Sequence, residues 1–299
     1  MINKQYLLKN IIISKKIFFK IDKFIFNSFL LKFYNQIKYN FKLIIINLFK
    51  RNIYLKKNHK LNKRLIVSLT SYPKRFRTLP LVLNSIMEQT VLPDKIILWI
   101  ENKDKEKLPT TVLNFKGVDI EFCQNGLLSY KKIIPSLKKY RNSNIITLDD
   151  DFVYSKKTIE KLVSNSRKFP NDVIANRIHK INVINNYPSS YRLWSRNYMK
   201  KTKFAFFTSG AGALFPPNCF YKDVLKKNYF KKLTPYADDI WLNWMVRLNK
   251  TNVRFSKIYK NYEYIKIIKG GLYKKNFKNN YNDIQIKNMI QKYGFPFLQ

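Results

Sequence analysis

A short apolar run that ends in three consecutive carboxylates constrains the fold of this chain more than any other feature. Residues Ile145–Leu148 carry one polar side chain, and the triplet Asp149–Asp151 follows directly. Apolar runs of this length, rich in β-branched residues, are typical of buried strands, so the three acids stand at a strand exit. Adjacent like charges repel unless a cation or hydrogen-bond donors hold them. Mg²⁺ and Mn²⁺ prefer such oxygen ligands, so the triplet indicates a metal site. The alternative to a metal site is an acidic loop that starts the next helix with an Asp N-cap.

From Arg64 onward, strand patterns alternate with helical patterns. The predicted strands are Leu65–Leu69, Lys95–Ile100, Val118–Cys123 and Asn144–Leu148, and the helices between them are Leu79–Gln89 and Ser129–Tyr140. Strands separated by helices predict an α/β fold with an open, mostly parallel, doubly wound sheet flanked by helices. Ligands of such sheets gather at the carboxyl ends of the strands, so we expect the loops after the strands to face one crevice. This domain is predicted over residues 64–265. A basic tail is predicted over residues 266–299, with a short helix over Ile284–Tyr293.

Residues 1–63 form a predicted basic arm. Asp22 is their only acid, and apolar residues recur at steps of three and four from Phe18 to Leu48, as in a long amphipathic helix. Charges interrupt every 18-residue window, so we expect no transmembrane helix. An apolar face bordered by Lys predicts contact with an anionic membrane surface, which would hold a cytoplasmic protein peripherally at the inner face of the cell membrane. The alternative is a helix packed on the domain or on a partner subunit.

The overall composition excludes several classes of protein. The two cysteines and two histidines are far apart in the sequence and lack the paired spacing of zinc ligands, so we expect no structural zinc site. A disulfide framework is excluded as well, which suits a reducing cytoplasm. The net charge of +40 indicates either a polyanionic partner or a drift of the whole chain toward Lys. The basic residues follow no recognised nucleic-acid motif, so we expect no nucleic-acid partner.

The loop after the first strand combines hydroxyl groups, an aromatic ring and cations. Thr70, Ser71, Tyr72 and Arg75 could stack a nucleobase, bond its edges and hold phosphate. An ordinary strand-to-helix turn is the alternative. Lys132 lies near a helix N-terminus, where backbone N–H groups and a Lys suit a diphosphate. The alternative is that Lys132 is an ordinary solvated charge with no role in binding.

Two later stretches complete the candidate site. Residues 207–217 concentrate small side chains between aromatics, which allows either close backbone approach to a ligand or a tight core crossing beneath the site. Asp238 and Asp239 open a helix over Ile240–Leu248, and an N-cap role would explain one acid but not both. An inverting glycosyl transfer needs a metal-binding acid group for the departing diphosphate. It also needs a separate carboxylate that takes the proton from the attacking hydroxyl.

Over roughly residues 64–250, the chain resembles bacterial family 2 glycosyltransferases of the GT-A type. The motifs that carry the resemblance are Val67–Tyr72, Gln89-Thr90, Asp149–Asp151 and Asp238-Asp239. The resemblance implies a UDP- or GDP-linked sugar as donor, Mn²⁺ or Mg²⁺ as cofactor, and a glycan or lipid-linked acceptor in surface-polysaccharide synthesis. In the family an acid usually follows the third strand and contacts the nucleotide base. Here Asn125 occupies that region and is assigned to the donor site in place of the acid.

The resemblance also implies roles for the individual acids. The metal ligands would be Asp149 and Asp151, or Asp150 and Asp151, and the nucleotide-sugar donor would bind at the same strand end. The catalytic base would be Asp239 or Asp238. Two rival functions remain: a metal-dependent nucleotidyltransferase or phosphotransferase that uses the same acidic strand end, and a nucleic-acid-binding protein drawn to phosphate by the high positive charge.

Overall fold

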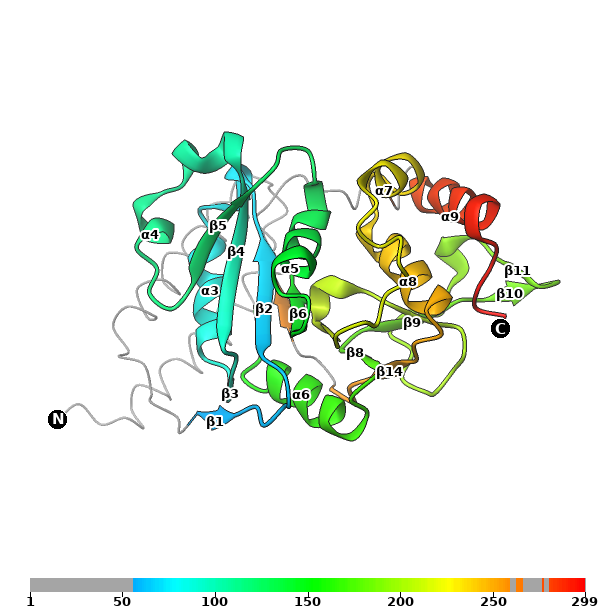
Figure 1. The fold of residues 1–299 in the computed structure, drawn as a ribbon, viewed down its shortest axis with the longest axis horizontal. Helices are drawn as coiled ribbons and strands as arrows, with labels where there is room; N and C mark the ends of the chain where they lie inside the picture. The colour runs from blue at the N-terminus through cyan, green and yellow to red at the C-terminus, as the bar shows by residue number, and fades with distance from the viewer. Residues whose placement is uncertain (1–55, 259–261, 266–275, 277–279, 299) are drawn as a thin grey trace, which may run out of the picture. The chain divides into compact units, whose positions relative to one another are not determined.

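The computed structural model of the protein describes residues 56–258, 262–265, 276 and 280–298 (Figure 1). The chain divides into two compact units, Met1–Asn52 and Ile53–Gln299. The predicted arm lies outside the described residues, apart from residues 56–63. These contribute strand β1 (Lys57–Asn58), which pairs in parallel with β3 (Val91–Leu92). Within the described part of the chain, no helix is long and apolar enough to cross a membrane.

A seven-stranded sheet forms the centre of the domain (Figure 1). Its strands in spatial order are β14 (Val253–Phe255), β8 (Val173–Ala175), β13 (Ala213–Phe215), β6 (Asn144–Leu148), β2 (Leu65–Thr70), β4 (Lys95–Glu101) and β5 (Asp119–Cys123). Strands β6, β2, β4 and β5 are parallel, β14 is parallel to β8, and β13 is antiparallel to both of its neighbours. The predicted open, mostly parallel α/β sheet is confirmed.

Helices and short strand pairs surround this sheet. The helices are α3 (Leu79–Met87), α4 (Thr110–Leu113), α5 (Ile134–Lys139), α6 (Thr158–Lys168), α7 (Lys227–Leu233), α8 (Asp238–Leu248) and α9 (Tyr281–Tyr293). The antiparallel strand pairs are β7 (Phe152–Tyr154) with β15 (Tyr262–Tyr264), β9 (Ile178–Lys180) with β12 (Ala205–Phe207), and β10 (Val183–Ile184) with β11 (Tyr187–Pro188). Short 3-10 turns cover Pro73–Arg75, Asn102–Lys107, Leu128–Lys132, Tyr191–Leu193 and Ser209–Ala211.

Both faces of the sheet are buried, and strand β2 shows how. Leu65, Val67 and Leu69 belong to a core that includes side chains of α3, α4 and α6. Ile66 belongs to a second core, which α5, α7, α8 and α9 complete. A parallel strand that is covered on both faces has an almost continuous apolar sequence. This explains why the strand could be recognised from its sequence.

The predicted helix Ser129–Tyr140 is two elements in the structure. A 3-10 turn over Leu128–Lys132 comes first, and α5 begins at Ile134 with Pro135 in its first turn. In a continuous α-helix, Pro135 would lack the N–H that bonds to the carbonyl four residues earlier, and its ring would clash with that carbonyl. The proline therefore divides the helix.

The C-terminal helix is an integral part of the domain. It was predicted from Ile284, begins three residues earlier as α9, and buries Ile286 and Met289 in the second core. Trp244 of α8 donates its ring N–H to the carbonyl of Gly294 at 3.0 Å. The predicted tail thus contributes packing to the sheet domain through its described residues.

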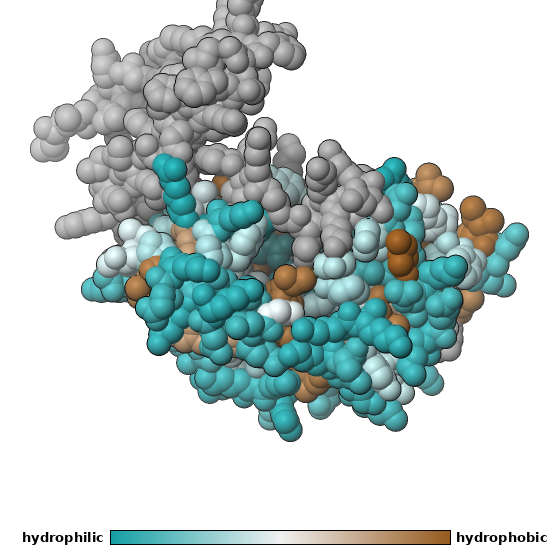
Figure 2. Space-filling view, turned by 90° about the horizontal axis from the view of Figure 1, so that it is seen from above, coloured by the Kyte–Doolittle hydropathy of each residue, from teal (hydrophilic) through white to brown (hydrophobic). Residues whose placement is uncertain are grey.

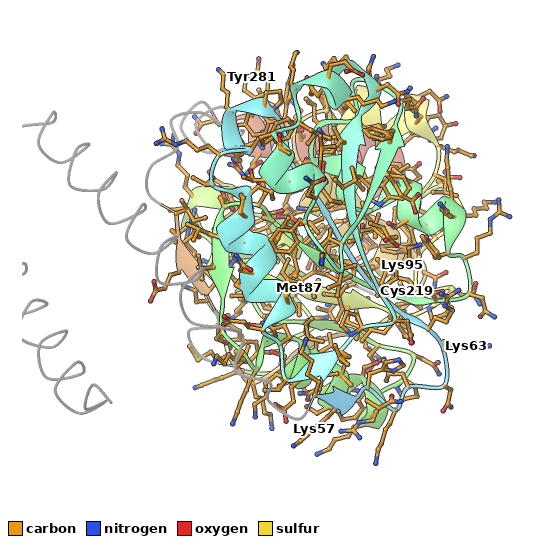
Figure 3. The ribbon with its side chains drawn as sticks, turned by 90° about the vertical axis from the view of Figure 1, so that its left-hand side faces the viewer. Lys57, Lys63, Met87, Lys95, Cys219 and Tyr281 are labelled. Atoms are coloured by element: carbon orange, nitrogen blue, oxygen red, sulfur yellow. The ribbon has the colours of Figure 1, made fainter. Side chains whose placement is uncertain are left out.

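Basic side chains on the surface come from elements far apart in the sequence. Lys57 and Lys63 are exposed at the start of the domain (Figure 3). Lys95, at the start of β4, forms an ion pair with Asp119 of β5 at 2.7 Å. These examples match the spread of Lys along the chain and are not grouped on one motif.

Candidate active site

One edge of the sheet collects the predicted site residues. Because β2, β4, β5 and β6 are parallel and in register, their carboxyl ends lie together (Figure 1). Five carboxylates from this edge and from the start of α8 lie among three cations, and four of them form ion pairs with two of the cations. The carboxylates, which we call the acid cluster, are Asp149, Asp150, Asp151, Asp238 and Asp239, and the cations are Lys132, Arg75 and Arg177.

Lys132 joins the acidic triplet to the start of α8. Its ammonium nitrogen lies 2.6 Å from Oδ1 of Asp149 and 3.1 Å from Oδ2 of Asp238, and its side chain is 4% exposed. Burial alone would lower the pKa of Lys132, but the charges of the two carboxylates outweigh burial and raise it. Burial likewise opposes ionisation of Asp149, yet Lys132 lowers the pKa of that carboxyl. The residue predicted to bind the donor diphosphate is thus engaged by two carboxylates in this structure.

Arg75 and Ser71, both predicted to contact the donor, hold the other two acids of the triplet. Ser71 donates its hydroxyl to Oδ2 of Asp150 at 2.5 Å, and Arg75 binds Oδ1 of the same carboxylate. The other Nη atom of Arg75 lies 3.1 Å from Oδ2 of Asp151. Oδ1 of Asp151 is buried without a hydrogen-bond partner among the described residues. Burial and the charge of Asp149 raise the pKa of Asp151 to about 6.

The acidic pair at the start of α8 does not cap the helix. The N-cap residue is Ala237, and no side chain forms a capping hydrogen bond. Oδ1 of Asp239 instead accepts the N–H of Ser209 at 2.8 Å and its hydroxyl at 2.5 Å. Burial and the charge of Asp238 raise the pKa of Asp239 to about 6, although Lys132 and Ser209 act in the opposite direction. Such a carboxylate is ionised at neutral pH and remains able to accept a proton.

The loop that holds Asp239 also touches the acidic triplet. A Cβ atom on Gly210 would lie 1.7 Å from Oδ2 of Asp149, so only a glycine leaves room for that carboxylate. The carbonyl of Gly210 accepts the N–H of Asp149 at 3.1 Å and the hydroxyl of Tyr154 at 2.6 Å. The small side chains of residues 207–217 therefore allow the backbone to approach the acidic triplet closely.

The remaining predicted donor-site residues have different surroundings. The hydroxyl of Thr70 donates to the carbonyl of Trp99 at 2.7 Å and so joins β2 to β4. The Tyr72 ring lies under the guanidinium of Arg75, 5.4 Å from its centroid, and its hydroxyl is buried without a partner among the described residues. Asn125 is exposed and accepts the N–H of Lys103 at 3.1 Å. Within the described chain, no hydrogen bond or ion pair joins Asn125 to the acid cluster.

Two charged residues at this edge were not identified from the sequence. Glu101 ends β4, is buried, and is bound by Lys103 at 2.9 Å and by the N–H of Gly126 at 3.0 Å. An acid at the end of an apolar strand, on the edge of the sheet where ligands bind, is a pattern that could have identified Glu101 from the sequence. Arg177 follows β8 outside any motif, and its partners Tyr262 and Tyr264 are 85 and 87 residues away in the sequence. No local pattern could have indicated it.

The acid cluster fits a divalent cation. Five carboxylates against three cations leave an excess of two negative charges when all are ionised. Asp151 has its unpartnered Oδ1, and no described group is hydrogen-bonded to Oδ2 of Asp149. Among the described residues, no three Asp, Glu, His or Cys side chains converge as a complete metal site. A cation there would take one or two carboxylates and complete its shell with water and substrate phosphate, as Mg²⁺ commonly does.

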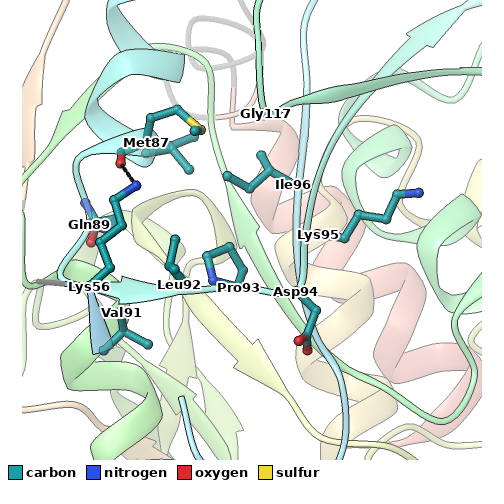
Figure 4. Close-up of a pocket in the computed structure, with 11 residues that line it drawn as sticks. Lys56, Met87, Gln89, Val91, Leu92, Pro93, Asp94, Lys95, Ile96 and Gly117 are labelled. Atoms are coloured by element: carbon teal, nitrogen blue, oxygen red, sulfur yellow. Dashed lines mark hydrogen bonds between the residues drawn. The ribbon is translucent and has the colours of Figure 1, made fainter. Parts of the chain in front are cut away.

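Two pockets lie away from this cluster. One, of about 110 Å³, is at the amino ends of the parallel strands, where Met87 and Asp94 line it and Lys56 donates to the Met87 carbonyl at 3.0 Å (Figure 4). The other, of about 500 Å³, lies beside Arg247 and Phe297 at the end of α8 remote from the acid cluster. Neither is lined by an acid of the cluster, so the chemistry of the side chains places the site at the opposite edge of the sheet.

The fold and the acid cluster together indicate a transferase of GT-A-like architecture. The sequence model of glycosyl transferase family 2 matches residues 69–230, which is more than half of the chain. The chain belongs to that family, and the resemblance seen in its sequence is confirmed.

Several solved structures are similar in chain trace. TarS residues 1–349 from S. aureus in complex with UDP is 15% identical with a TM-score of 0.42, over 67% of this chain and 59% of that one. A 4-diphosphocytidyl-2C-methyl-D-erythritol synthase from Anaerococcus prevotii is 14% identical with a TM-score of 0.44, over 74% and 99% of the two chains. This chain thus spans 59% of the TarS chain. No curated protein matches the sequence.

Proposed function

We propose that the protein is an inverting glycosyltransferase that moves a sugar from a nucleotide-sugar donor to a hydroxyl group of a glycan or lipid-linked acceptor. The placement of Asp239 supports this proposal most strongly. Its carboxyl group has a pKa of about 6 and is held by Ser209. Lys132 ties the start of the same helix to Asp149. A carboxylate suited to accept a proton therefore stands beside a separate acidic group suited to the donor.

In the proposed reaction, Asp239 accepts the proton of the acceptor hydroxyl while the hydroxyl oxygen bonds to the anomeric carbon. The bond from that carbon to the diphosphate breaks on the opposite face, so the configuration inverts and nucleoside diphosphate leaves. Ser209 binds Oδ1 of Asp239, and the proton goes to Oδ2. Lys132 keeps Asp149 ionised at the donor end.

Mg²⁺ or Mn²⁺ would be held by Asp149 and Asp151 in this proposal. When bound, the cation neutralises negative charge on the departing diphosphate. The unpartnered Oδ1 of Asp151 supports the assignment. Arg75 and Ser71 already occupy both oxygens of Asp150, which favours Asp149 over Asp150 as the second ligand.

A panel of UDP- and GDP-sugars, supplied with Mg²⁺ or Mn²⁺ and assayed for released nucleoside diphosphate, tests the function. We expect release from at least one donor, and its loss in Asp239→Asn but not in Asp119→Asn, whose acid is exposed at the start of β5. Pyrophosphate release from a nucleoside triphosphate and a sugar phosphate would instead identify a nucleotidyltransferase. Salt-sensitive binding to RNA or DNA without any turnover would support the nucleic-acid alternative.

We also propose that the enzyme acts in surface-polysaccharide synthesis while attached peripherally to the inner face of the cell membrane. Residues 173–222 contain no Asp or Glu. Within them Ile184 and Leu193 are each 64% exposed, and Met199 is 51% exposed. Apolar side chains gather at the end of the molecule that carries β10 and β11 (Figure 2). A segment without acids that exposes apolar groups suits anionic lipid, which attracts each nearby Lys or Arg by about 1 kcal/mol.

A further inference from the structure

Arg177 stands out because neutral groups hold it. Its Nε donates to the hydroxyl of Thr208, and one Nη donates to the hydroxyls of Tyr262 at 2.8 Å and Tyr264 at 2.9 Å. The guanidinium carbon lies 5.7 Å from the ring centroid of Phe152 and 5.6 Å from that of Tyr262. Hydroxyl acceptors and aromatic faces fix the orientation of the group without cancelling its charge.

The other two cations of the site are different. Lys132 and Arg75 each bridge two carboxylates, whereas no carboxylate of the described residues forms an ion pair with Arg177. The second Nη of Arg177 also has no hydrogen-bond partner among the described residues. A largely buried cation that lacks an anionic partner has unused capacity to bind an anion.

The supports of Arg177 place it within the candidate site. Thr208 directly precedes Ser209, the residue that binds Asp239. Strand β15, which supplies Tyr262 and Tyr264, pairs with β7, and β7 follows the acidic triplet. The charge of Arg177 acts on both acidic groups: it helps to lower the pKa of Asp149, and Asp239 helps to raise the pKa of Arg177 against burial.

We propose that Arg177 binds the diphosphate of the nucleotide-sugar donor and of the departing nucleoside diphosphate. This inference rests on the proposed glycosyltransferase function. The planar guanidinium presents paired N–H donors that match phosphate oxygens, and Lys cannot reproduce that geometry. Tyr262 and Tyr264 act as positioning residues, because they hold the fork without contacting the reacting atoms. The competing explanation is that Arg177 only balances the charge of the acid cluster.

Calorimetric titration of the full chain with UDP, UMP, GDP and GMP, with and without Mg²⁺, separates these explanations. The informative quantity is the ratio of the dissociation constants of UMP and UDP, or of GMP and GDP. We expect Arg177→Gln to weaken binding of the diphosphate by about tenfold to a hundredfold, with a much smaller effect on the monophosphate. Arg177→Lys keeps the charge and should fall between the wild type and Arg177→Gln.

Matched variants guard against a merely structural effect. Arg254→Gln removes an arginine of β14 that is paired with Asp172 and stacked on Phe169, and it should leave the ratio unchanged. The double variant Tyr262→Phe/Tyr264→Phe should lower the ratio while Arg177 is still present. If Arg177 only balances charge, Arg177→Gln should have a lower melting temperature and Arg177→Lys should leave the ratio of dissociation constants unchanged. That result would overturn the inference about the diphosphate and leave the proposed function standing. Failure of the wild type to bind any of these nucleotides would overturn both the inference and the proposed function.

Discussion

The ammonium group of Lys132 lies 2.6 Å from Oδ1 of Asp149, and the ammonium group of Lys139 lies at the same distance from Oε2 of Glu121. The two ion pairs differ in burial: the side chain of Lys132 is 4% exposed and that of Lys139 is 52% exposed. Since buried charges depend on their partners far more than solvated ones, equal distances here imply unequal energies. The inner pair links the donor end of the site to the helix that carries the proposed base.

Replacing Lys132 should therefore cost much more stability than replacing Lys139. Lys132→Met leaves Asp149 and Asp238 without their cation, and we expect a loss of about 3–5 kcal/mol in the free energy of unfolding. Lys139→Met removes a solvated pair and should cost about 1 kcal/mol or less. Urea denaturation of both variants measures the difference. Equal losses would show that the inner pair contributes no more than a surface one.

A second prediction concerns the contact between Gly210 and Asp149. In Gly210→Ala the new Cβ would lie 1.7 Å from Oδ2 of Asp149, so the carboxylate must move out of its position. We expect donor turnover to fall at least about a hundredfold, because small displacements of catalytic groups have large effects on rate. Gly294→Ala is the control, since its Cβ meets no atom within 4 Å. Its φ of +70° and ψ of −168° lie in a region that essentially only Gly adopts, so a clearly lower stability with normal activity is expected there.

The pH dependence of the rate tests the proposed base. Asp239 must be deprotonated to accept a proton, and its pKa of about 6 predicts that kcat/KM rises with pH and levels off above this value. Asp238 raises this pKa, whereas Lys132 and Ser209 lower it. Ser209→Ala removes the hydroxyl donor, so its profile should shift to higher pH. Asp239→Asn should lose most of the rate with donor affinity intact, and a normal profile in that variant would reject Asp239 as the base.

Metal binding distinguishes the two ligand pairs that the sequence left open. If Asp149 and Asp151 hold the cation, Asp151→Asn should bind Mn²⁺ at least about tenfold more weakly in the presence of UDP. Asp150→Asn should retain Mn²⁺, because both oxygens of Asp150 are already bound by Ser71 and Arg75. Thermal melting with and without Mn²⁺ and UDP provides a readout independent of turnover. Full activity of the wild type in excess chelator would remove the metal from the proposal.

The strands of the site edge were predictable because both of their faces are buried. β2, β4 and β6 are predominantly apolar, and the acidic triplet marks where β6 ends. Which cation pairs with which carboxylate was not predictable from the sequence. Lys132 meets Asp238 only because α8 folds back over the edge, and one Lys among 58 Lys and Arg residues gives no local sign of such a contact. Pairings of this kind depend on tertiary packing and not on spacing along the chain.

The final prediction concerns the membrane. Residues 1–55 of the predicted arm lie outside the described residues, but the domain has its own candidate contact surface around Ile184 and Leu193. We expect the full chain to sediment with vesicles containing anionic lipid and to be released by high salt, because the attraction of Lys and Arg to the surface is screened.

Two variants separate the contributions to this binding. A chain that begins at Ile53 lacks residues 1–52 of the arm. The variant Ile184→Ser/Leu193→Ser removes the two most exposed apolar side chains of the domain surface. If both regions touch lipid, each change alone should weaken co-sedimentation, and the combination should abolish it. If the arm packs on protein instead, the shortened chain should aggregate or melt early while the full chain ignores vesicles. Absence of lipid binding by the full chain at low salt would end the membrane proposal and leave the transfer reaction untouched.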